Sequence, residues 1–323
     1  MQKSTASHSK QIIAFATLAI AALTALAIAL PQQTLAAEPQ SDLTLTTQAS
    51  KGIVNATIFS SNGGTDPILT KTVKKYDITG DGKADSIRFE ITGVNYSFAS
   101  TLKVYVNKKL CYTSLGYNDY GFIANAVTAK YLRMKSGAPF LFVECNTNNN
   151  DGTHDILQYR KGKLVPMVSN SQLPTGYGNH NQIRSAKVSG NTIKVKFMQM
   201  TYAAGAIYST YTYVKKDGKL KRKSSQTSSL EYSTYVDGAT KSGKPYGAAR
   251  TSMKTYKSPG SSKAAFTVKL GQKIKLTKMC FKSGKLYFRA TTKSGKSGWF
   301  ESPSHGYGTY GGDTLVEGTY MAG

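Results

Sequence analysis

The sequence predicts an all-β protein, and two observations carry the prediction. Short runs of alternating apolar and polar residues recur, for example at 102–106, 192–197 and 208–214, and such alternation is typical of half-buried strands. Turn-forming stretches separate these runs, as at 189–191 and 216–219, and short strands joined by turns favour a sandwich, a barrel or a propeller. We therefore expect an N-terminal β-repeat domain, either a partial propeller or a sandwich, followed by a small β-barrel.

The N-terminal residues have the pattern of a secretory signal peptide. Lys3 and Lys10 precede an apolar run over 12–30, and Pro31 and small residues up to Ala37 follow it. This order of a positive, an apolar and a small-residue segment is typical of export signals. We expect cleavage near Ala37, an extracellular protein associated with the cell wall, and no transmembrane segment after cleavage. An uncleaved membrane anchor is the alternative, because the apolar run is long.

Composition divides the rest of the chain into five parts. These are a flexible polar segment at 38–50, a β domain at 51–225, a Ser/Thr/Gly/Lys-rich linker at 226–247, a small domain at 248–303 and a Gly/Tyr-rich tail at 304–323, expected to be poorly ordered. Within the β domain, 124–133 is the only fair candidate for a helix, and it is short.

A loop with regularly spaced oxygen-bearing side chains follows the first predicted strand of the β domain. Asp77, Thr79, Asp81 and Asp85 belong to it, and glycines at 80 and 82 let the backbone coil tightly. Calcium needs several oxygens that converge on one point, and the carbonyl of Lys83 is a further candidate. We expect a weak Ca²⁺ site here. A plain hairpin turn is the alternative, because Asp-Gly between apolar runs is a strong turn signal.

The flanks of this loop separate it from an EF-hand. The twelfth position counted from Asp77 is Arg88, where an EF-hand needs a bidentate glutamate. Short β-compatible runs, 72–76 and 86–91, lie on either side of the loop. This strand, acidic loop and strand unit resembles the FG-GAP/VCBS-type repeats of extracellular proteins. The resemblance implies blades of the kind that build propellers.

A degraded copy of the loop lies at 147–155. The copy keeps Asp151 and Asp155 and has Asn149, but Thr147 replaces the first carboxylate. We expect a polar turn here more than a second metal site, and we interpret the copy as a sign of repetition. A second repeated phrase, at 159–164 and 213–220, predicts two hairpins that each close a repeat.

Positive charge is strong and unevenly distributed. The 323-residue chain has 42 Lys and Arg against 17 Asp and Glu, a net charge of +25. Removal of the signal leaves 40 basic and 17 acidic residues, or +23. Residues 241–300 contain 13 Lys and two Arg but no acidic residue. Such a field attracts polyanions in a salt-dependent way.

The partner we expect is an anionic polymer of the cell wall or peptidoglycan. Lysine is more frequent than arginine in the basic segment, and lysine lacks the planar guanidinium group with which arginine makes two hydrogen bonds to guanine. Export also argues against nucleic acid, so we expect no specific nucleic-acid partner. The alternative is a solvated basic surface that has no dedicated ligand.

The same basic segment carries the pattern of a small β module. Two alternating runs, 266–270 and 273–276, flank Gly271, a third run covers 285–289, and Gly298-Trp299-Phe300 ends the series. The pattern resembles bacterial SH3-like (SH3b-type) cell-wall modules, which implies a small β-barrel that often serves as a wall-binding accessory. The family's opening strand is only approximated at 253–260.

Several side chains of this module are candidates for ligand contact. Tyr256 is the candidate in the first loop, whereas we expect Trp299, the only tryptophan, to be a core residue. The candidates for binding an anionic ligand are Lys254, Lys257, Lys273, Lys275, Lys285, Lys293 and Lys296.

Cysteine and histidine are few, which limits the chemistry. Cys111 and Cys145 are candidates for a disulfide, with buried free thiols as the alternative, and we expect Cys280 in the core. His154, nine residues after Cys145, offers only a weak nucleophile–base pair.

No catalytic residue is assigned. We expect an exported, non-catalytic binding protein with a calcium-stabilised β domain and a basic module that retains it on the wall. A wall hydrolase or its inhibitor, with the active surface on the N-terminal β domain, is the alternative, and a structural spacer is a third. The sequence does not predict an oligomeric state.

Overall fold

The chain is known from a computed structural model. It describes residues 69–92, 98–99, 101–115, 122–123, 127–145, 152–173, 181–232, 234–236, 239–241, 246–306 and 314–317. All of them belong to one compact unit, Gln40–Gly323. The predicted signal peptide at 1–37 and flexible segment at 38–50 lie outside the described residues. In the described part of the chain no helix is long and apolar enough to cross a membrane.

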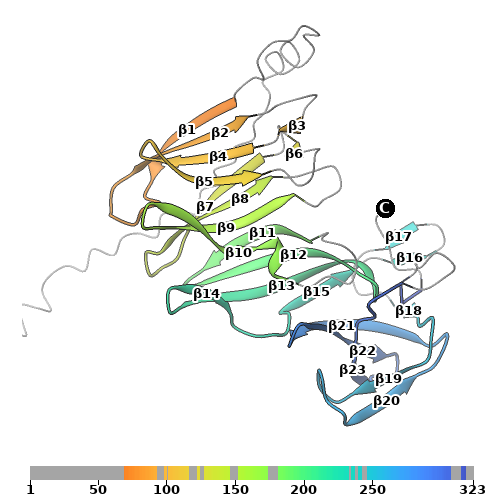
Figure 1. Cartoon of the computed structure of the whole chain (residues 1–323). Helices are drawn as coiled ribbons and strands as arrows, with labels where there is room; N and C mark the ends of the chain where they lie inside the picture. Colours follow the sequence, from red (N-terminus) through yellow and green to blue (C-terminus); the bar gives the residue numbers. More distant parts are fainter. Residues whose placement is uncertain are drawn as a thin grey trace, which may run out of the picture. The chain divides into compact units, whose positions relative to one another are not determined.

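The predicted all-β class is confirmed. Antiparallel strands form nearly all the regular structure in the described ranges, with one short 3₁₀ turn, η2 (Asn170–Gln172), and no α-helix (Figure 1). The helix candidate at 124–133 is wrong, because 127–133 forms strand β7. Its buried residues Val127, Ala129 and Tyr131 alternate with half-buried ones, and this period of two fits a strand.

Three antiparallel sheets follow one another along the chain, each with its strands in sequence order. The first contains β1 (Leu69–Tyr76), β2 (Asp85–Thr92), β4 (Thr101–Val106) and β5 (Lys109–Leu115). The second contains β7 (Val127–Arg133), β8 (Pro139–Cys145), β9 (Thr153–Arg160) and β10 (Lys163–Ser169). The third contains β11 (Asn181–Ser189), β12 (Thr192–Thr201), β13 (Gly205–Lys216) and β14 (Lys219–Arg222), and β15 (Ser229–Tyr232) also pairs with β13.

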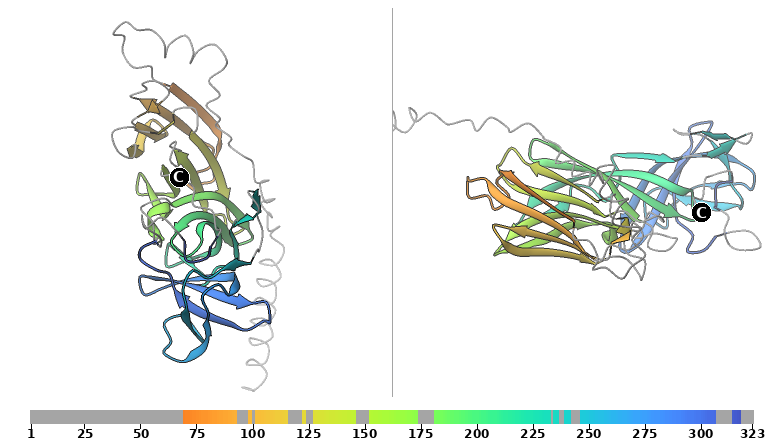
Figure 2. Two further views of the ribbon diagram at one scale, coloured as in Figure 1. Left: turned by 90° about the vertical axis from the view of Figure 1, so that its right-hand side faces the viewer. Right: turned by 90° about the horizontal axis from the view of Figure 1, so that it is seen from above.

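Four-stranded meanders of this kind are the units from which propeller blades are made. Two two-stranded antiparallel sheets are also present, β3 (Phe98–Ala99) with β6 (Phe122–Ile123), and β16 (Thr234–Val236) with β17 (Ala239–Lys241). Figure 2 shows the sheets following one another in chain order, from the first sheet to the C-terminal strands.

The C-terminal sheet has six strands in the order β18-β21-β22-β23-β19-β20. Their bounds are β18 (Gly247–Ala248), β19 (Met253–Tyr256), β20 (Ala264–Val268), β21 (Lys273–Lys282), β22 (Lys285–Thr292) and β23 (Ser297–Glu301). No strand pairing joins the edge strands β18 and β20 within the described ranges, so the predicted small barrel is an open sheet there. Strand β18 is only two residues long and pairs only with β21.

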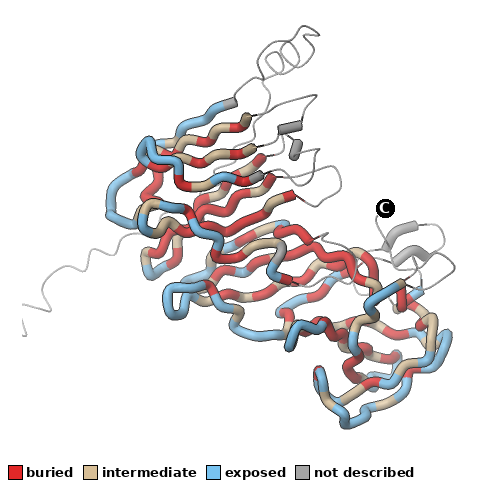
Figure 3. The backbone as a smooth tube through the Cα atoms, viewed as in Figure 1, coloured by how far each residue is buried: buried red, intermediate tan, exposed pale blue. Residues whose placement is uncertain are grey.

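The second sheet is buried on both faces (Figure 3). Strand β8 shows this best, because Leu141, Val143 and Cys145 pack with the first sheet, whereas Phe140 and Phe142 pack on the opposite side. Alternating residues of a strand point to opposite faces, so a run that is apolar throughout indicates a strand covered on both sides.

The third sheet and the C-terminal sheet share one hydrophobic core. Phe197 and Tyr211 of the third sheet belong to the same buried cluster as Phe288 and Phe300 of the C-terminal sheet. Backbone hydrogen bonds also connect the two, from Thr227 N to Met279 O (2.9 Å) and from Phe281 N to Ser225 O (3.0 Å). The C-terminal sheet therefore packs directly against the third sheet and is not a separate domain.

Two segments are more ordered than the sequence indicated. The predicted linker at 226–247 contains β15, whose Leu230 and Tyr232 are buried. The predicted poorly ordered tail contains 314–317, where Val316 is fully buried and bridges to Ala249. A Cβ on Gly247 would collide with the Val316 side chain. Both segments look polar because only two apolar side chains anchor each of them.

Candidate functional site

The acidic loop at 77–85 is closed by hydrogen bonds to its own backbone. Asp77 Oδ1 accepts from the amides of Gly80 (2.6 Å) and Asp81 (3.1 Å), and its Oδ2 accepts from Gly82 (3.0 Å). Asp85 Oδ2 accepts from the amides of Ile78 and Thr79, each at 2.8 Å. Both carboxylates are nearly buried. They therefore hold the loop in place through donors that would otherwise be unsatisfied.

The outer wall of the loop comes from elements far away in the sequence. Asn107, in the turn between β4 and β5, donates from Nδ2 to Asp85 Oδ1 at 2.6 Å and accepts from Ser86 N at 2.9 Å. Tyr131 of β7 donates to the carbonyl of Asp77 at 2.9 Å, and its ring stacks on Tyr76 at 4.7 Å. The loop thus joins the first sheet to the second.

The oxygens that the calcium prediction needs come together only in part. Thr79 Oγ1 lies 3.5 Å from Asp77 Oδ1 and 3.3 Å from Asp85 Oδ1. Asp81 is exposed, and its Oδ1 accepts from Lys83 N at 2.8 Å. Within the described ranges no three acidic, His or Cys side chains form a group that could hold a metal. An ion would have to replace donors already in place, and calcium binding stays a prediction.

The predicted second loop divides between described and undescribed residues. Asn149 and Asp151 lie outside the described residues, but Asp155 is a buried residue of β9. The hydroxyl of Tyr112, on β5, donates to Asp155 Oδ2 at 2.8 Å. Burial raises the pKa of Asp155, and the hydrogen bond from Tyr112 opposes that shift. Asp155 therefore ties β9 to the first sheet.

Cys145 and His154 lie on opposite faces of the second sheet. Cys145 pairs with Thr153 across β8 and β9, and Glu144 pairs with His154; side chains of directly paired residues share a face, and neighbours in a strand do not. Burial raises the pKa of Cys145, so the thiol stays protonated and weakly nucleophilic. This arrangement does not bring the two residues together as a nucleophile and its base.

His154 is a buried residue with one hydrogen bond. Its Nδ1 lies 2.9 Å from the carbonyl oxygen of Ile183 on β11, and its Nε2 has no partner among the described residues. Burial lowers the pKa of His154 to about 4, although the bond to Ile183 opposes the shift. A neutral imidazole in this position joins the second and third sheets.

The three cysteines are buried free thiols. The candidate disulfide between Cys111 and Cys145 is therefore not formed, and the alternative of buried thiols holds. Both belong to the core between the first and second sheets. Cys280 packs with Tyr287 and Trp299 in a small cluster on the other side of the C-terminal sheet from Phe288, as expected for a core residue.

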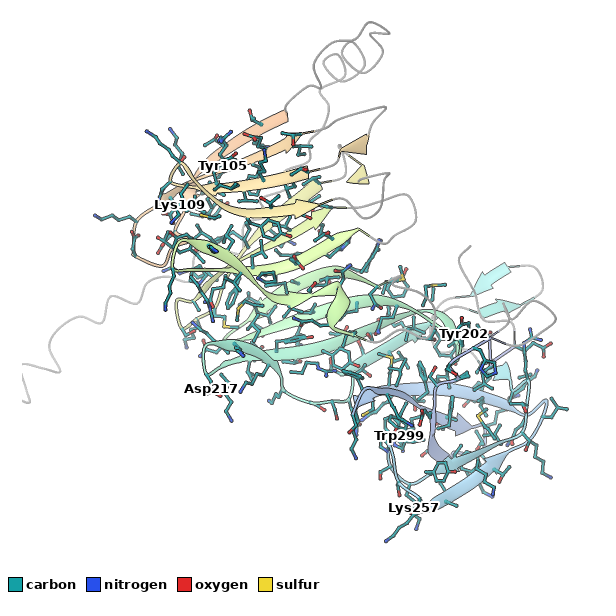
Figure 4. The ribbon with its side chains drawn as sticks, in the orientation of Figure 1. Tyr105, Lys109, Tyr202, Asp217, Lys257 and Trp299 are labelled. Carbon is teal, nitrogen blue, oxygen red and sulfur yellow. The ribbon has the colours of Figure 1, made fainter. Side chains whose placement is uncertain are left out.

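The lysines predicted to bind an anion are spread over the C-terminal sheet, where Figure 4 labels Lys257. All of them are exposed except Lys275, which is half-buried with Nζ 5.7 Å from the ring centre of Tyr246. Lys285 pairs with Glu301 at 3.0 Å, and this hydrogen bond raises its pKa. Lys254 and Lys273 lie in strands and 257, 293 and 296 in turns, so the set forms a charged surface without one common pocket.

The aromatic candidates of this sheet are paired residues of neighbouring strands. Trp299 is 7% exposed, which fits the expected core role. Tyr256 pairs with Trp299 across β19 and β23 and is half-buried. The turn at 257–263 lies over the cluster, because Lys282 Nζ donates to Pro259 O at 3.3 Å and a Cβ on Gly260 would lie 3.5 Å from Tyr287 Oη. Little of the indole is left for a ligand.

Two further turns repeat the predicted hairpin. The turns at 161–162 and 217–218 are where the sequence predicts them, and those at Asn107–Lys108 and Ser283–Gly284 have the same conformation, with two positive φ angles. In each case the turn is followed by Lys and Leu, with the lysines Lys109, Lys163, Lys219 and Lys285. The missing glycine hid the first copy; the signal that identifies it is the Lys-Leu pair after a two-residue turn.

Comparison with protein-family models, with curated proteins and with solved structures finds no match for this chain.

Proposed function

We propose that the protein is an exported, non-catalytic binding protein that is retained at the cell surface by its basic C-terminal sheet. The observation that carries this proposal is the charge of that sheet. From 246 to 301 the sheet has a single acidic residue, Glu301, and most of its lysines are exposed. Exposed cations on a rigid sheet raise the local concentration of a polyanion and are sensitive to salt. The ligand class is an anionic wall polymer or peptidoglycan.

The strand order supports the likeness to SH3-type wall modules. A hairpin, β19–β20, is inserted before the three-stranded meander β21-β22-β23, and the chain returns to bridge Ala249 with Val316. In this proposal the N-terminal sheets present the module or recognise a further ligand.

The test is co-sedimentation of the full chain with intact cell walls across a range of salt concentrations. Deletion of the module is a poor test, because it would uncover the core shared with the third sheet. We therefore choose a triple variant, Lys273→Gln, Lys293→Gln and Lys296→Gln, at exposed positions. The matched control carries Lys71→Gln, Lys74→Gln and Lys194→Gln, which are also exposed.

The proposal predicts that the module variant sediments less than the control and that salt releases the wild-type chain. Walls stripped of their anionic polymers should retain less protein. Equal sedimentation of the two variants at every salt concentration would contradict the role of the C-terminal sheet.

The non-catalytic part of the proposal is tested by zymography on purified wall material. No clearing is expected. A clearing zone that is lost in Cys145→Ala but kept in Cys280→Ala would instead establish a hydrolase. Both thiols are buried, so the second variant controls for loss of stability.

Calcium binding by the loop at 77–85 is a further part of the proposal. It is supported by the approach of Asp77, Thr79 and Asp85 to one another. Calcium should raise the thermal unfolding temperature of the wild-type chain and leave that of Asp81→Asn nearly unchanged, because Asp81 is the one exposed carboxylate of the loop and only a local bond from Lys83 N holds it. Equal shifts for both would rule out this site.

A further inference from the structure

A row of three stacked hairpin turns gathers nine of the 23 Lys and Arg residues at the described positions of 69–222. The turns join β4 to β5, β9 to β10 and β13 to β14, and strand β10 contacts both β5 and β14. All three lie along one side of the molecule in Figure 1, and Figure 4 labels Lys109 in the first and Asp217 in the third. We call these turns and the residues beside them the hairpin row.

Two close contacts show that the turns pack on one another. A Cβ placed on Gly162 would lie 2.5 Å from Nζ of Lys109, so the first hairpin lays a lysine over the second turn. A Cβ placed on Gly218 would lie 3.4 Å from Nη2 of Arg160, so the second hairpin covers the third turn in the same way. Nothing lies within 4 Å of a Cβ on Gly284, whose turn in the C-terminal sheet is similar.

The hairpin row is strongly basic. Its nine cations face a single carboxylate, Asp217; they are Lys108, Lys109, Arg160, Lys161, Lys163, Lys215, Lys216, Lys219 and Lys221. All of these lysines are exposed. Lys221 pairs with Asp217 at 2.8 Å, and no other lysine of the row has an ion pair with a carboxylate in the described part of the chain. Seven of the eight lysines are therefore exposed charges that no carboxylate of the described residues neutralises.

The three hairpins arrange these cations along a line. Packed sheets lie about 10 Å apart, so three hairpins in a row cover about 20 Å. The equivalent lysines Lys109, Lys163 and Lys219 each open the outermost strand of their sheet. Ammonium groups serve as point charges for phosphate, and eight of the nine cations are lysines.

We propose that the hairpin row is a second binding surface, separate from the C-terminal sheet, and that its ligand is an extended polymer that carries repeated phosphate charges. The polymer lies across the three turns and contacts ammonium groups of each in succession. Orthophosphate is too short to engage more than one turn. The inference does not depend on the proposed retention by the C-terminal sheet, because no residue is shared.

The test measures binding of the full chain to linear inorganic polyphosphate of defined length at fixed salt. Affinity should rise with chain length until the polymer spans about 20 Å and then level off. The variant with Lys109→Gln, Lys163→Gln and Lys219→Gln should bind a long polyphosphate about tenfold more weakly and with a shallower salt dependence. Orthophosphate should bind both proteins weakly and alike.

Two matched variants make the result specific. The triple variant at 71, 74 and 194 removes the same charge elsewhere and should keep most of the affinity. The triple variant at 273, 293 and 296 tests the C-terminal sheet, so failure of one proposal is distinguishable from failure of the other. Thermal unfolding of all three variants checks that they are folded.

Other outcomes would overturn the inference. Equal affinity of the hairpin-row variant and the 71, 74 and 194 variant would show that only net charge matters. Tighter binding of polygalacturonate than of polyphosphate of matched length would replace phosphate by carboxylate as the ligand. Lysines on edge strands also prevent sheet-to-sheet association. Self-association of the hairpin-row variant with unchanged polyphosphate binding would assign them that role instead.

Discussion

Single residues hold the acidic loop together, and Asp85 has the largest share. Its carboxylate is almost fully buried and serves two backbone amides and the side chain of Asn107. Replacement by alanine leaves these donors without a partner. The desolvation free energy of an unsatisfied buried donor exceeds the net free energy that its hydrogen bond contributes to folding. We expect Asp85→Ala to lower the free energy of unfolding by about 2–4 kcal/mol.

Urea denaturation with and without calcium measures this effect. Asp81→Ala is the control, because Asp81 is exposed and accepts only from Lys83. The loss in Asp85→Ala should persist when calcium is removed by a chelator. A loss that disappears with the chelator would show that the carboxylate acts through an ion and not through the backbone.

His154 gives the fold a dependence on pH. Its pKa is lowered by burial to about 4, against an ordinary value of 6.5. Between pH 6.5 and 4 the histidine is protonated in the unfolded chain but neutral in the folded protein. The free energy of unfolding is therefore highest above pH 6.5 and falls as the pH is lowered toward 4. The expected loss is about 3 kcal/mol at most. Glu144 lies 3.9 Å away with a raised pKa and opposes this trend.

Chemical denaturation at pH 7, 6, 5 and 4 measures the slope, and His154→Gln isolates the histidine contribution. The variant should lose less stability than the wild type between pH 6.5 and 4. Parallel curves for the two proteins would mean that His154 is not responsible.

At the scale of elements, the two-residue turns set the register of the hairpins. In the turns at 107–108, 161–162, 217–218 and 283–284 both central residues have positive φ, a conformation that glycine adopts without strain. At Gly162 the φ of 79° is combined with the close approach of Lys109. We expect Gly162→Ala to cost about 1–2 kcal/mol from the backbone alone, with a further loss from the displaced lysine.

The matched comparison is Gly190→Ala, because Gly190 has a φ of 57° with nothing within 4 Å of a Cβ. Thermal unfolding should show a larger loss at 162 than at 190. Adding Lys109→Ala should recover part of the loss at 162 only. Equal losses at the two glycines would show that the hairpins are not in contact.

At the scale of the whole molecule, the shared core predicts one cooperative unfolding unit. Trp299, the only tryptophan, reports the C-terminal sheet by its fluorescence, whereas far-UV circular dichroism reports all sheets. The two transitions should coincide, and Phe288→Ala should shift both by the same amount. A fluorescence transition that precedes the dichroism transition would show that the C-terminal sheet unfolds independently.

Much of the fold could be predicted because local signals are strong where a strand is half-buried. The alternation at 192–197 is compatible only with a strand, and Asp-Gly at 217–218 only with a tight turn. Both elements are where the sequence predicts them. The run at 124–133 predicts a helix wrongly, because a short segment with alanine and leucine satisfies helix propensity as well as a period of two. Packing decides for a strand there. β7 pairs with β8 of the second sheet, and its buried residues contribute to the cores on both faces of that sheet.

The candidate sites divide in the same way. The oxygens of Asp77 and Asp85 are where their spacing predicts them, but their partner Asn107 lies 22 residues beyond Asp85 and no local pattern indicates it. Cys145 and His154 are close in sequence yet face opposite cores. Spacing along a strand tells which residues share a face, whereas it does not tell what lies against that face.

The sequence by itself determined the β class, the turn positions and the basic charge of the C-terminal sheet, because alternation, glycine and lysine act locally. Tertiary structure alone decided that β15 and 314–317 complete a common core and that three hairpins stack into one basic row. Those outcomes depend on which sheet packs against which. Contacts of that kind are made by a few side chains far apart in the chain, and no period in the sequence records them.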